Sequence, residues 1–518
     1  MIWKRRLLIG TAVLAGAGLV SIAGVSASAS IGDGPPAVHL AQGELTGSSS
    51  DSVEEYLGIP YAKPPVGDLR WRPPVPADPW AGTLDATKPA PDCAQGAGGD
   101  SDGSLSENCL YLNVYAPAAA KKDMPVVVFI HGGGYTAGTP NIYDGRRFAD
   151  TGEAVVVIPA YRLGNFGFFA TPGTAAEGEF GAQGNWGILD QQEALRWVAD
   201  NIAAFGGDPD NVTIVGESAG AGSVCVQLAS PTAEGLFDRA VIESLGCGIS
   251  VAPRPSDVTA DWGCAADDMA CLRAVPAAEI VGTPASFGAN APIAGGPDLP
   301  VPPLQAAADG TLADVPLIVG ATRDEWIGFE SGAYPLAPEA YEARIRAQFG
   351  AAADEVLARY PADAGEDPIF PMGWVSGDSF IVCPAFASAQ AFVEAGNSVY
   401  FYEFADRTAP GWRSLGDPFP PSTLQLGATH TTELQYLFDY QAAQHGLNRE
   451  QDKLSAQMVG LWISFAKTGV PKGTKGTPEW KAFDGERVLE LQTKSAGGSQ
   501  MISTFEQSHN CDFWNNAG

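Results

Sequence analysis

The sequence predicts an α/β protein built on a large, mostly parallel and doubly wound sheet. Short unbroken runs of Val, Ile, Leu and Phe recur along the chain, as is typical of parallel strands covered on both faces. Segments with the apolar periodicity of helices alternate with these runs. Such alternation predicts a parallel sheet with helices on both faces, whose ligands bind beyond the carboxyl ends of the strands.

The expected strands cover residues 126–130, 154–159, 212–215, 239–244, 315–319 and 399–404. The expected helices cover residues 189–205, 218 to about 228, and 453–467. A length of 518 residues alone would allow three domains, but the sheet elements extend from the first third almost to the end. We therefore expect one domain over residues 30–518, with helical cap segments inserted into it.

The N-terminus has the features of a secretory signal peptide over residues 1–29. Three basic residues at 4–6 precede an apolar stretch over residues 7–25, and Ala-Ser-Ala at 27–29 is a typical cleavage pattern. An uncleaved membrane anchor is the alternative, and the arginine pair weakly suggests twin-arginine export. No later stretch approaches eighteen uninterrupted apolar residues, so we expect a secreted or periplasmic protein without stable membrane association.

The composition also restricts the partners. A formal net charge of -30 argues against nucleic acid and anionic membranes, because binding to either depends on Lys and Arg. We interpret the acidity as a solvated surface, with steering of cationic substrates as the alternative. Eight cysteines, an even number, predict disulfides in an exported chain. No Cys-x-x-Cys or His-x-x-x-His spacing occurs, so no metal or other cofactor is implied.

Ser218 lies in a pattern typical of activated nucleophiles. Residues 216–220 read Gly-Glu-Ser-Ala-Gly, between an expected strand and an expected helix. A strand-to-helix turn of this kind strains the serine, so small residues are needed two positions away on each side, which Gly216 and Gly220 supply. Ser218 is therefore the candidate nucleophile, although the bare five-residue pattern also occurs in ordinary loops.

A glycine-rich segment, His-Gly-Gly-Gly at residues 131–134, follows the expected strand over residues 126–130. Attack on a carbonyl builds negative charge on its oxygen, and amides in a glycine loop can approach that charge without obstruction. We expect Gly133 and Gly134 to form an oxyanion hole with the amide of Ala219. A merely flexible turn is the alternative, and His131 is expected to brace the loop.

The base for Ser218 should be a histidine, whose pKa near neutrality suits proton transfer. The chain has five histidines, at positions 39, 131, 430, 445 and 509. Hydrolases with such a serine turn follow the order Ser, acid, His, with each partner on a loop after a strand. This order favours His430, which follows the expected strand over residues 399–404, over His445 in a polar segment.

The acid should lie between Ser218 and His430, at the carboxyl end of a strand, where it can orient the imidazole. The expected strand over residues 315–319 leads to Asp324 and Glu325, and both qualify. Position alone does not separate them. For either one, a solvated loop carboxylate or a partner of Arg323 is the alternative.

These motifs resemble those of the type-B carboxylesterase and cholinesterase family, over nearly the whole mature chain. The resemblance rests on GIPYA at residues 58–62, PVGDLRW at 65–71, SENCLYLN at 106–113, YRLG at 161–164 and the segment 184–220. It implies an α/β-hydrolase fold and hydrolysis of a small-molecule carboxylic ester through an acyl-enzyme, without a cofactor. It also implies a Ser218, Glu325 and His430 triad, which decides for Glu325 over Asp324.

Further features follow from the same resemblance. It implies a buried, structural ion pair between Arg70 and Glu107, and it makes Glu217 a pocket-wall carboxylate, with a structural hydrogen-bonding role equally open. The implied disulfides join Cys93 with Cys109, Cys264 with Cys271, and Cys383 with Cys511. Cys225 and Cys247 are left over. Cys225 lies about two turns down its expected helix and Cys247 follows a strand at the opposite end, which disfavours a bond and leaves their pairing open.

The departures from the family concern the substrate. The loop between Cys93 and Cys109 has no tryptophan, so the aromatic platform with which cholinesterases hold quaternary ammonium groups is missing. Residues 243–247 and 291–300 also depart from the family pattern, and acyl preference stays open. A lipase or an esterase for bulky esters is the nearest alternative, and a non-catalytic binding module is the alternative from another class. The oligomeric state is unknown.

Overall fold

The computed structural model describes residues 35–516 except 99–100, 120, 178–183, 249–256, 284–289, 366, 412–423, 441–444 and 474–475. The chain divides into two compact units, Met1–Pro35 and Pro36–Gly518, and the description below concerns the second. The signal peptide expected at residues 1–29 lies outside the described residues.

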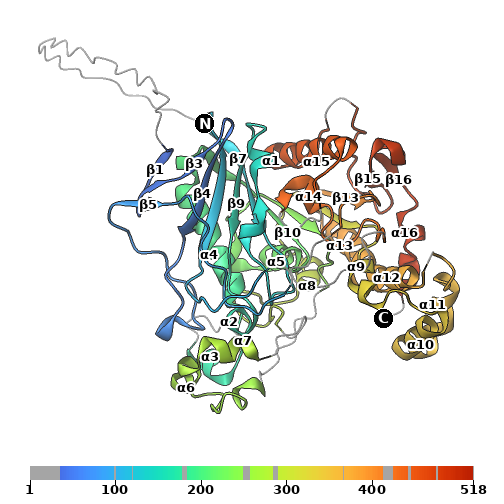
Figure 1. Cartoon of the computed structure of the whole chain (residues 1–518), viewed down its shortest axis with the longest axis horizontal. Helices are drawn as coiled ribbons and strands as arrows, with labels where there is room; N and C mark the ends of the chain where they lie inside the picture. The colour runs from blue at the N-terminus through green and yellow to red at the C-terminus, as the bar shows by residue number, and fades with distance from the viewer. Residues whose placement is uncertain are drawn as a thin grey trace, which may run out of the picture. The chain divides into compact units, whose positions relative to one another are not determined.

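Among the described residues, one sheet of eleven strands organises the fold, in the order β16-β15-β13-β12-β11-β10-β7-β9-β6-β4-β3 (Figure 1). The seven neighbouring strands from β15 to β9 run parallel, and antiparallel strands extend the sheet at both edges. The sheet strands are β3 (Ser48–Ser49), β4 (Val53–Pro60), β6 (Tyr111–Pro117), β7 (Met124–Ile130), β9 (Val155–Pro159), β10 (Gly207–Glu217), β11 (Arg239–Glu243), β12 (Leu317–Thr322), β13 (Val399–Phe404), β15 (Val488–Leu491) and β16 (Gln500–Ile502). Two small sheets combine β1 (Ala37–Leu40), β2 (Gly43–Thr46) and β5 (Thr83–Asp85), and β8 (Tyr143–Asp144) with β14 (Asp439–Tyr440).

The α-helices among the described residues are α1 (Arg146–Ala149), α2 (Gly164–Gly167), α3 (Pro172–Glu177), α4 (Trp186–Asn201), α5 (Ala219–Ala229), α6 (Met269–Ala274), α7 (Ala277–Gly282), α8 (Pro303–Ala308), α9 (Ile327–Glu330), α10 (Pro338–Phe349), α11 (Ala353–Arg359), α12 (Ile369–Gly377), α13 (Cys383–Glu394), α14 (Leu434–Leu437), α15 (Arg449–Thr468), α16 (Phe505–Ser508) and α17 (Cys511–Trp514). A π-helical turn, Asp378–Val382, joins α12 to α13.

The predicted α/β architecture is confirmed, and each of the six predicted strands lies in the central sheet. Strand β12 begins two residues later than expected because Pro316 has no N–H for the ladder. Helix α15 begins four residues earlier than expected. Its start is fixed by a capping box, in which the Asn448 side chain accepts from the amide of Gln451 and the Gln451 side chain accepts from the amide of Asn448.

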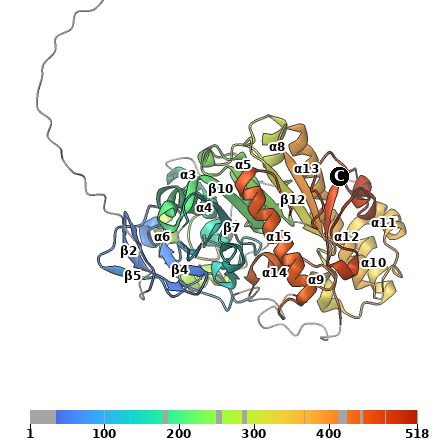
Figure 2. The same ribbon diagram turned by 90° about the horizontal axis from the view of Figure 1, so that it is seen from above.

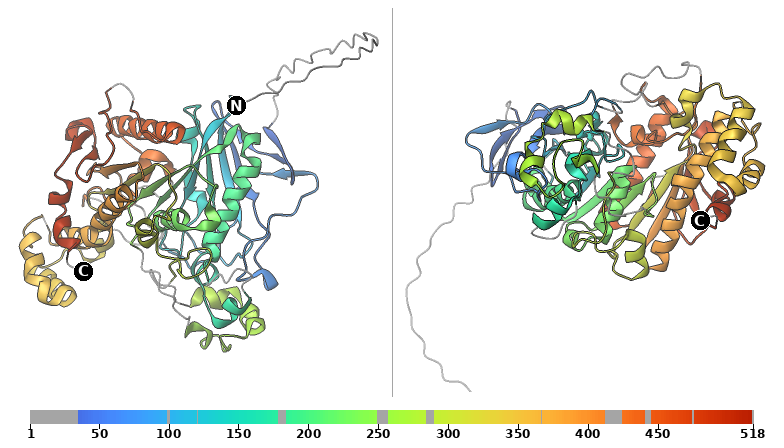
Figure 3. Two further views of the ribbon diagram at one scale, coloured as in Figure 1. Left: turned by 180° about the vertical axis from the view of Figure 1, so that it is seen from behind. Right: turned by 90° about the horizontal axis from the view of Figure 1, so that it is seen from below.

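Helices cover both faces of the sheet, so most of its strands are buried on both sides. One face packs against α4, α5 and α13, and the other packs against α1, α14 and α15. Figure 2 shows α15 crossing the sheet on one face, with α5 and α13 on the other. Figure 3 shows the molecule from behind and from below. This two-sided burial explains the unbroken apolar strands of the sequence.

Short helices are inserted at one end of this framework. Figure 1 shows α3, α6 and α7 grouped beyond the lower end of the sheet, and α10 and α11 in a lobe beside α12. Each group has its own small apolar core. These are the helical cap insertions expected from the sequence.

One helical run within the described residues, Ile369–Glu394, is long and apolar enough to cross a membrane by length and composition. It comprises α12, the π-helical turn and α13. Of its most apolar window, 67% is buried inside the fold, which is the pattern of a core helix.

Four disulfides cross-link the described residues. They pair Cys93 with Cys109, Cys225 with Cys247, Cys264 with Cys271 and Cys383 with Cys511. The bond between Cys225 and Cys247 corrects the argument against their pairing, since their Cα atoms lie 5.5 Å apart. Cys247 does not remain at the end of β11, because the chain turns from β11 toward α13, where the Cys247 amide donates to Ser388 Oγ at 2.9 Å.

Candidate active site

Ser218 lies on a tight turn between β10 and α5. Its backbone has φ 57° and ψ -124°, a left-handed conformation that non-glycine residues rarely adopt. A Cβ atom on Gly216 would lie 2.3 Å from the carbonyl oxygen of Gly220, and one on Gly220 would lie 2.0 Å from that of Ile130. Neither position can hold a side chain. The Gly-x-Ser-x-Gly pattern is therefore a steric requirement of this turn.

The glycine segment 131–134 lies directly against the serine turn. A Cβ atom on Gly132 would lie 3.0 Å from the Cβ atom of Ser218. Gly133 and Gly134 have φ values of 106° and 62°, and both line the same cavity as Ser218. Ala219 begins α5, and the first amides of a helix have no partner within it. Gly133 and Gly134 thus line the same cavity as Ser218, and Ala219 follows it in the chain.

His131 is part of the wall behind this segment. Its ring is buried and stacks on Tyr161 with centroids 4.4 Å apart, while the Tyr161 hydroxyl donates to the His131 carbonyl at 2.8 Å. Burial lowers the pKa of His131 to about 4, so the ring stays neutral. This geometry supports the expected bracing role.

His430 and Glu325 are in direct contact. Nδ1 of His430 lies 2.6 Å from Oε2 of Glu325. The other carboxylate oxygen, Oε1, accepts from the amide of Thr322 at 2.8 Å, which fixes the side chain at the end of β12. Glu325 is 1% exposed. The pair has the arrangement of an imidazole oriented by a buried carboxylate.

Asp324 faces away from the imidazole. Its carboxylate accepts two hydrogen bonds from the Arg407 guanidinium, at 2.6 and 3.0 Å. It also accepts from the Trp374 indole at 2.9 Å and from the amide of Ala428 at 3.0 Å. Asp324 therefore ties the loop that precedes His430 to its surroundings.

A further buried carboxylate lies beside the other imidazole nitrogen. Nε2 of His430 lies 3.2 Å from Oε1 of Glu217, which is 1% exposed. Burial opposes the positive charge on His430, but the carboxylates of Glu217 and Glu325 outweigh it and raise its pKa to about 10. Burial and the Glu325 carboxylate raise the pKa of Glu433 to about 7, and burial raises that of Glu243 well above its usual range.

A cavity of about 650 Å³ opens onto these groups, a volume suited to a drug-sized ligand. Ser218, Glu217 and His430 line it together with the glycine segment. Most of the remaining wall is apolar, and it includes the side chains of Leu245, Val281, Trp326, Phe329, Phe380, Ile381 and Leu426. The ring of Phe329 lies 5.5 Å from that of His430.

The sequence comparisons agree with this geometry. A model of the carboxylesterase family matches residues 34–514. The chain belongs to the carboxylesterase family. It is 33% identical to fumonisin B1 esterase of Sphingopyxis macrogoltabida over 514 residues, which cover 95% of this chain and 92% of that protein. It is 35% identical to pyrethroid hydrolase Ces2e of Rattus norvegicus, covering 87% and 84%, and 34% identical to cocaine esterase of Homo sapiens, covering 90% and 87%.

The chain is therefore a carboxylesterase with the α/β-hydrolase fold, as the resemblance in the sequence implied. The name describes a reaction class, the hydrolysis of carboxylic ester bonds. Among the described residues of this carboxylesterase, no group of three or more His, Cys, Asp and Glu side chains could hold a metal ion.

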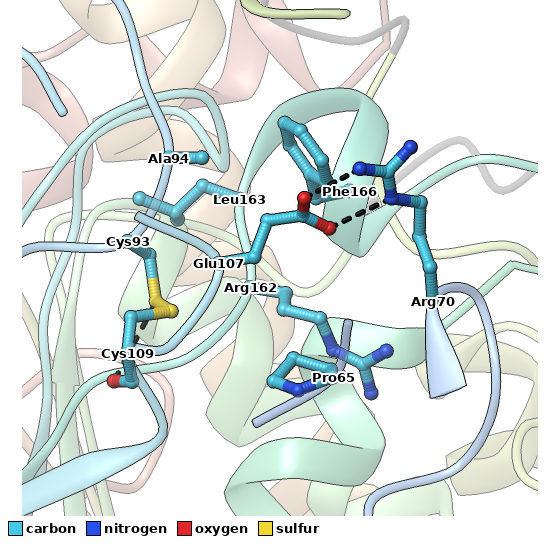
Figure 4. A pocket seen from close by; sticks show the side chains of 9 residues that line it. All are labelled: Pro65, Arg70, Cys93, Ala94, Glu107, Cys109, Arg162, Leu163 and Phe166. Carbon is cyan, nitrogen blue, oxygen red and sulfur yellow. Dashed lines mark hydrogen bonds and ion pairs between the residues drawn. A yellow bond between two sulfur atoms is a disulfide. The ribbon is translucent and has the colours of Figure 1, made fainter. Parts of the chain in front are cut away.

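The expected ion pair of the carboxylesterase lies beside a disulfide, outside the main cavity (Figure 4). Arg70 Nε and Nη2 donate to Glu107 at 2.7 and 2.5 Å, and both side chains are at most 10% exposed. Arg70 Nη1 also donates to the carbonyl of Val275, between α6 and α7, at 2.6 Å. The pair thus connects the N-terminal part of the chain to the inserted helices.

The sequence did not single out Glu433 or Phe329. Glu433 accepts a hydrogen bond from Ser244 Oγ at 2.9 Å, a contact between residues 189 positions apart in the chain. Its place three residues after His430 is the one signal that could have drawn attention to it. Phe329 stands four residues after Glu325, on the short helix α9 that follows the acid loop, and no local pattern marks it.

Proposed function

We propose that this carboxylesterase is an exported enzyme that cleaves carboxylic esters through an acyl-enzyme on Ser218, with His430 as base and Glu325 as acid. The observation that carries the proposal is the imidazole of His430, held by Glu325 at 2.6 Å in the cavity that also contains the strained Ser218. Activated serines of this kind are paired with an imidazole that a third group orients.

The reaction follows from these positions. Ser218 Oγ attacks the ester carbonyl carbon while Nε2 of His430 takes the hydroxyl proton. The amides of Gly133, Gly134 and Ala219 bind the oxyanion. The carbon–oxygen bond to the alcohol then breaks, and the alcohol leaves with the proton from His430. A water molecule, deprotonated by His430, attacks the acyl-enzyme, and the acid leaves as Ser218 regains its proton.

Glu217 lines the cavity next to Ser218 and is proposed to tune the charge on His430, given the 3.2 Å between their side chains. The size and apolar lining of the cavity support esters with a bulky alcohol group as substrates. The names of three relatives refer to fumonisin B1, pyrethroids and cocaine, which agrees with a site for large organic esters.

Export is proposed on the signal-peptide pattern at residues 1–29, and the four disulfides support an oxidising compartment outside the cytoplasm. N-terminal sequencing of the mature protein should begin at Ser30. A mature chain that begins with Met1 would contradict export with cleavage.

A fluorophosphonate probe tests the mechanism. Such a probe phosphonylates an activated serine, so the purified mature enzyme should be labelled with one equivalent per chain. Ser218→Ala should abolish labelling and ester hydrolysis. Ser223→Ala is the matched control, because that hydroxyl lies on the same helix and accepts from Gln191 at 2.9 Å. A folded wild-type protein that fails to react would overturn the proposal.

A further inference from the structure

The segment of residues 243–247 connects the candidate nucleophile to the wall of the cavity. The carbonyl oxygen of Glu243 accepts from the amide of Ser218 at 2.9 Å, and the amide of Ser244 donates to Gly320 at 2.8 Å. The segment therefore starts at the backbone of the serine turn itself. Leu245, two residues further on, is half-buried and lines the cavity.

The far end of this segment is fixed as firmly as its start. A Cβ atom on Gly246 would lie 2.5 Å from the backbone of Pro384, so the segment is pressed against α13. The amide of Cys247 donates to Ser388 on the same helix, and its sulfur is bonded to Cys225 of α5. Cys225 and Cys247 are both fully buried. Leu245 thus lies between two anchored points and has little freedom to move away from the cavity.

The proposed mechanism defines which part of an ester meets this wall. His430 returns its proton to the departing alcohol, so the alcohol group must lie on the His430 side, where Phe329 packs against the imidazole. The acyl group, bonded to Ser218, lies next to the serine turn. Leu245 lines the cavity from the segment that is hydrogen-bonded to this turn, two residues after Glu243.

We propose that Leu245 is a specificity-determining residue for the acyl group, and that the Cys225–Cys247 disulfide holds it in position, so that short, unbranched acyl groups are favoured. The inference rests on the proposed serine mechanism. A leucine held in place cannot retreat from a branched acyl chain, and a difference of one or two methyl groups in a tight pocket changes kcat/KM by roughly 10–200-fold.

Two substitutions of opposite size test the role of Leu245. The substrates are p-nitrophenyl acetate, 2-methylpropanoate and 2,2-dimethylpropanoate, which share one alcohol and differ in branching of the acyl group. Leu245→Ala should raise the ratio of kcat/KM for the branched esters to that for the acetate by about tenfold or more. Leu245→Phe should lower it. A second series, acetates of different phenols, should keep its ratios in both variants.

The disulfide is tested by the double variant Cys225→Ala/Cys247→Ala. It should raise the ratio of kcat/KM for the branched esters to that for the acetate, here called the acyl ratio, but by less than Leu245→Ala does. The segment of residues 243–247 becomes mobile in this variant, while the Leu245 side chain remains. The double variant Cys264→Ala/Cys271→Ala is the matched control, since that bond joins cysteines seven positions apart, neither of which lines the cavity. It should leave the ratio unchanged. An unchanged ratio in the Cys225/Cys247 variant would overturn the role of the disulfide.

Active-site titration with the fluorophosphonate separates this inference from the proposed function. Each rate is expressed per labelled serine, so partly folded preparations do not distort the ratios. Absence of labelling in the wild type would contradict the proposed function. Full labelling with an acyl ratio unchanged in both Leu245 variants, or with changes confined to the alcohol series, would overturn the role of Leu245 alone.

Discussion

Asp324 and Glu325 are consecutive in the chain, yet their carboxylates lie on opposite sides of one loop. Glu325 contacts His430 at 2.6 Å, whereas Asp324 accepts both of its charged hydrogen bonds from Arg407. The separation gives the two acids different tasks. In the proposed mechanism Glu325 orients the imidazole, whereas Asp324 holds the loop that precedes His430.

The two acids should therefore respond differently to removal of their charge. Glu325→Gln should lower kcat by about 10³–10⁴-fold, because the imidazole loses the carboxylate that orients it and stabilises its charged form. Asp324→Asn keeps an oxygen for Trp374, but its amide nitrogen can no longer accept from the Ala428 amide or pair with Arg407. We therefore expect kcat within about tenfold of the wild type and a lower Tm. Steady-state kinetics and thermal unfolding of both variants check this. A larger loss of kcat in Asp324→Asn would reverse the assignment.

The parts of the site that local patterns determine could be predicted from the sequence. The turn at Ser218 needs glycine at 216 and 220 for steric reasons, so the five-residue pattern is enough to predict its geometry. The buried strands could be predicted for the same reason, since burial on both faces leaves an unbroken apolar run. The α/β architecture then places the serine turn beyond the strand ends.

The parts that depend on distant contacts could not be predicted. A carboxylate at 324 or 325 satisfies the same pattern, and the groups that hold Asp324 away from His430 lie 50 to 104 residues later, on Trp374, Arg407 and Ala428. The pairing of Cys247 depends on a turn toward Ser388 that no local signal in residues 243–247 encodes. The hydrogen bond that holds Glu433 comes from Ser244, which also lies in a distant part of the chain.

The glycine segment offers a test of the proposed oxyanion hole. A Cβ atom at Gly133, where φ is 106°, would lie 2.0 Å from the carbonyl oxygen of Ala137, so Gly133→Ala must displace the segment. We expect kcat to fall by about 10²–10³-fold, the usual effect of losing an oxyanion donor. Gly310→Ala is the control. Gly310 also has positive φ, 69°, but has no atom within 4 Å of the added Cβ. Gly310→Ala should keep the kcat of the wild type. If kcat fell equally in Gly133→Ala and Gly310→Ala, the loss would not be specific to the glycine segment.

Glu217 should control the pH dependence of hydrolysis. His430 must be neutral to accept a proton, and its pKa is raised to about 10, with Glu217 as the strongest stabiliser of its charge. The wild-type kcat/KM should therefore rise toward alkaline pH. Glu217→Gln removes a negative charge 3.2 Å from Nε2, so the imidazolium loses its proton more easily and the rise should shift to lower pH by about 1–3 units.

Glu433→Gln provides a graded comparison for the same measurement. Glu433 also raises the pKa of His430, but its effect is smaller than those of Glu217 and Glu325. The pH profile of Glu433→Gln should therefore shift to lower pH, but by less than that of Glu217→Gln. Profiles of kcat/KM for p-nitrophenyl acetate, measured for the three proteins, distinguish these outcomes. A shift to higher pH in Glu217→Gln would contradict the electrostatic role.

A second buried histidine should make stability depend on pH. Nδ1 of His509 lies 2.6 Å from Asp378, and Nε2 lies 3.0 Å from Glu403. Burial opposes the charge on His509, but the two carboxylates outweigh it and raise its pKa to about 10. An unfolded histidine has a pKa near 6.5. The folded state therefore binds the proton more tightly than the unfolded state. The contribution of the protonated His509 to the stability of the fold is complete below pH 6.5 and disappears as the pH rises through 10.

His509→Gln should consequently lower Tm most at pH 6 and least near pH 10. At pH 6 the substitution removes the cation that Asp378 and Glu403 share, and removal of one partner of a buried pair costs about 3–5 kcal/mol. Glu403 keeps its pair with Arg323 and Asp378 keeps its bond from Tyr360, so we expect a loss at the lower end of this range. Near pH 10 the wild type has itself lost that cation, so the two Tm values should converge. His445→Gln is the control, because His445 is exposed, and its Tm should follow the wild type throughout. A gap between His509→Gln and the wild type that stays constant from pH 6 to pH 10 would mean that His509 is uncharged.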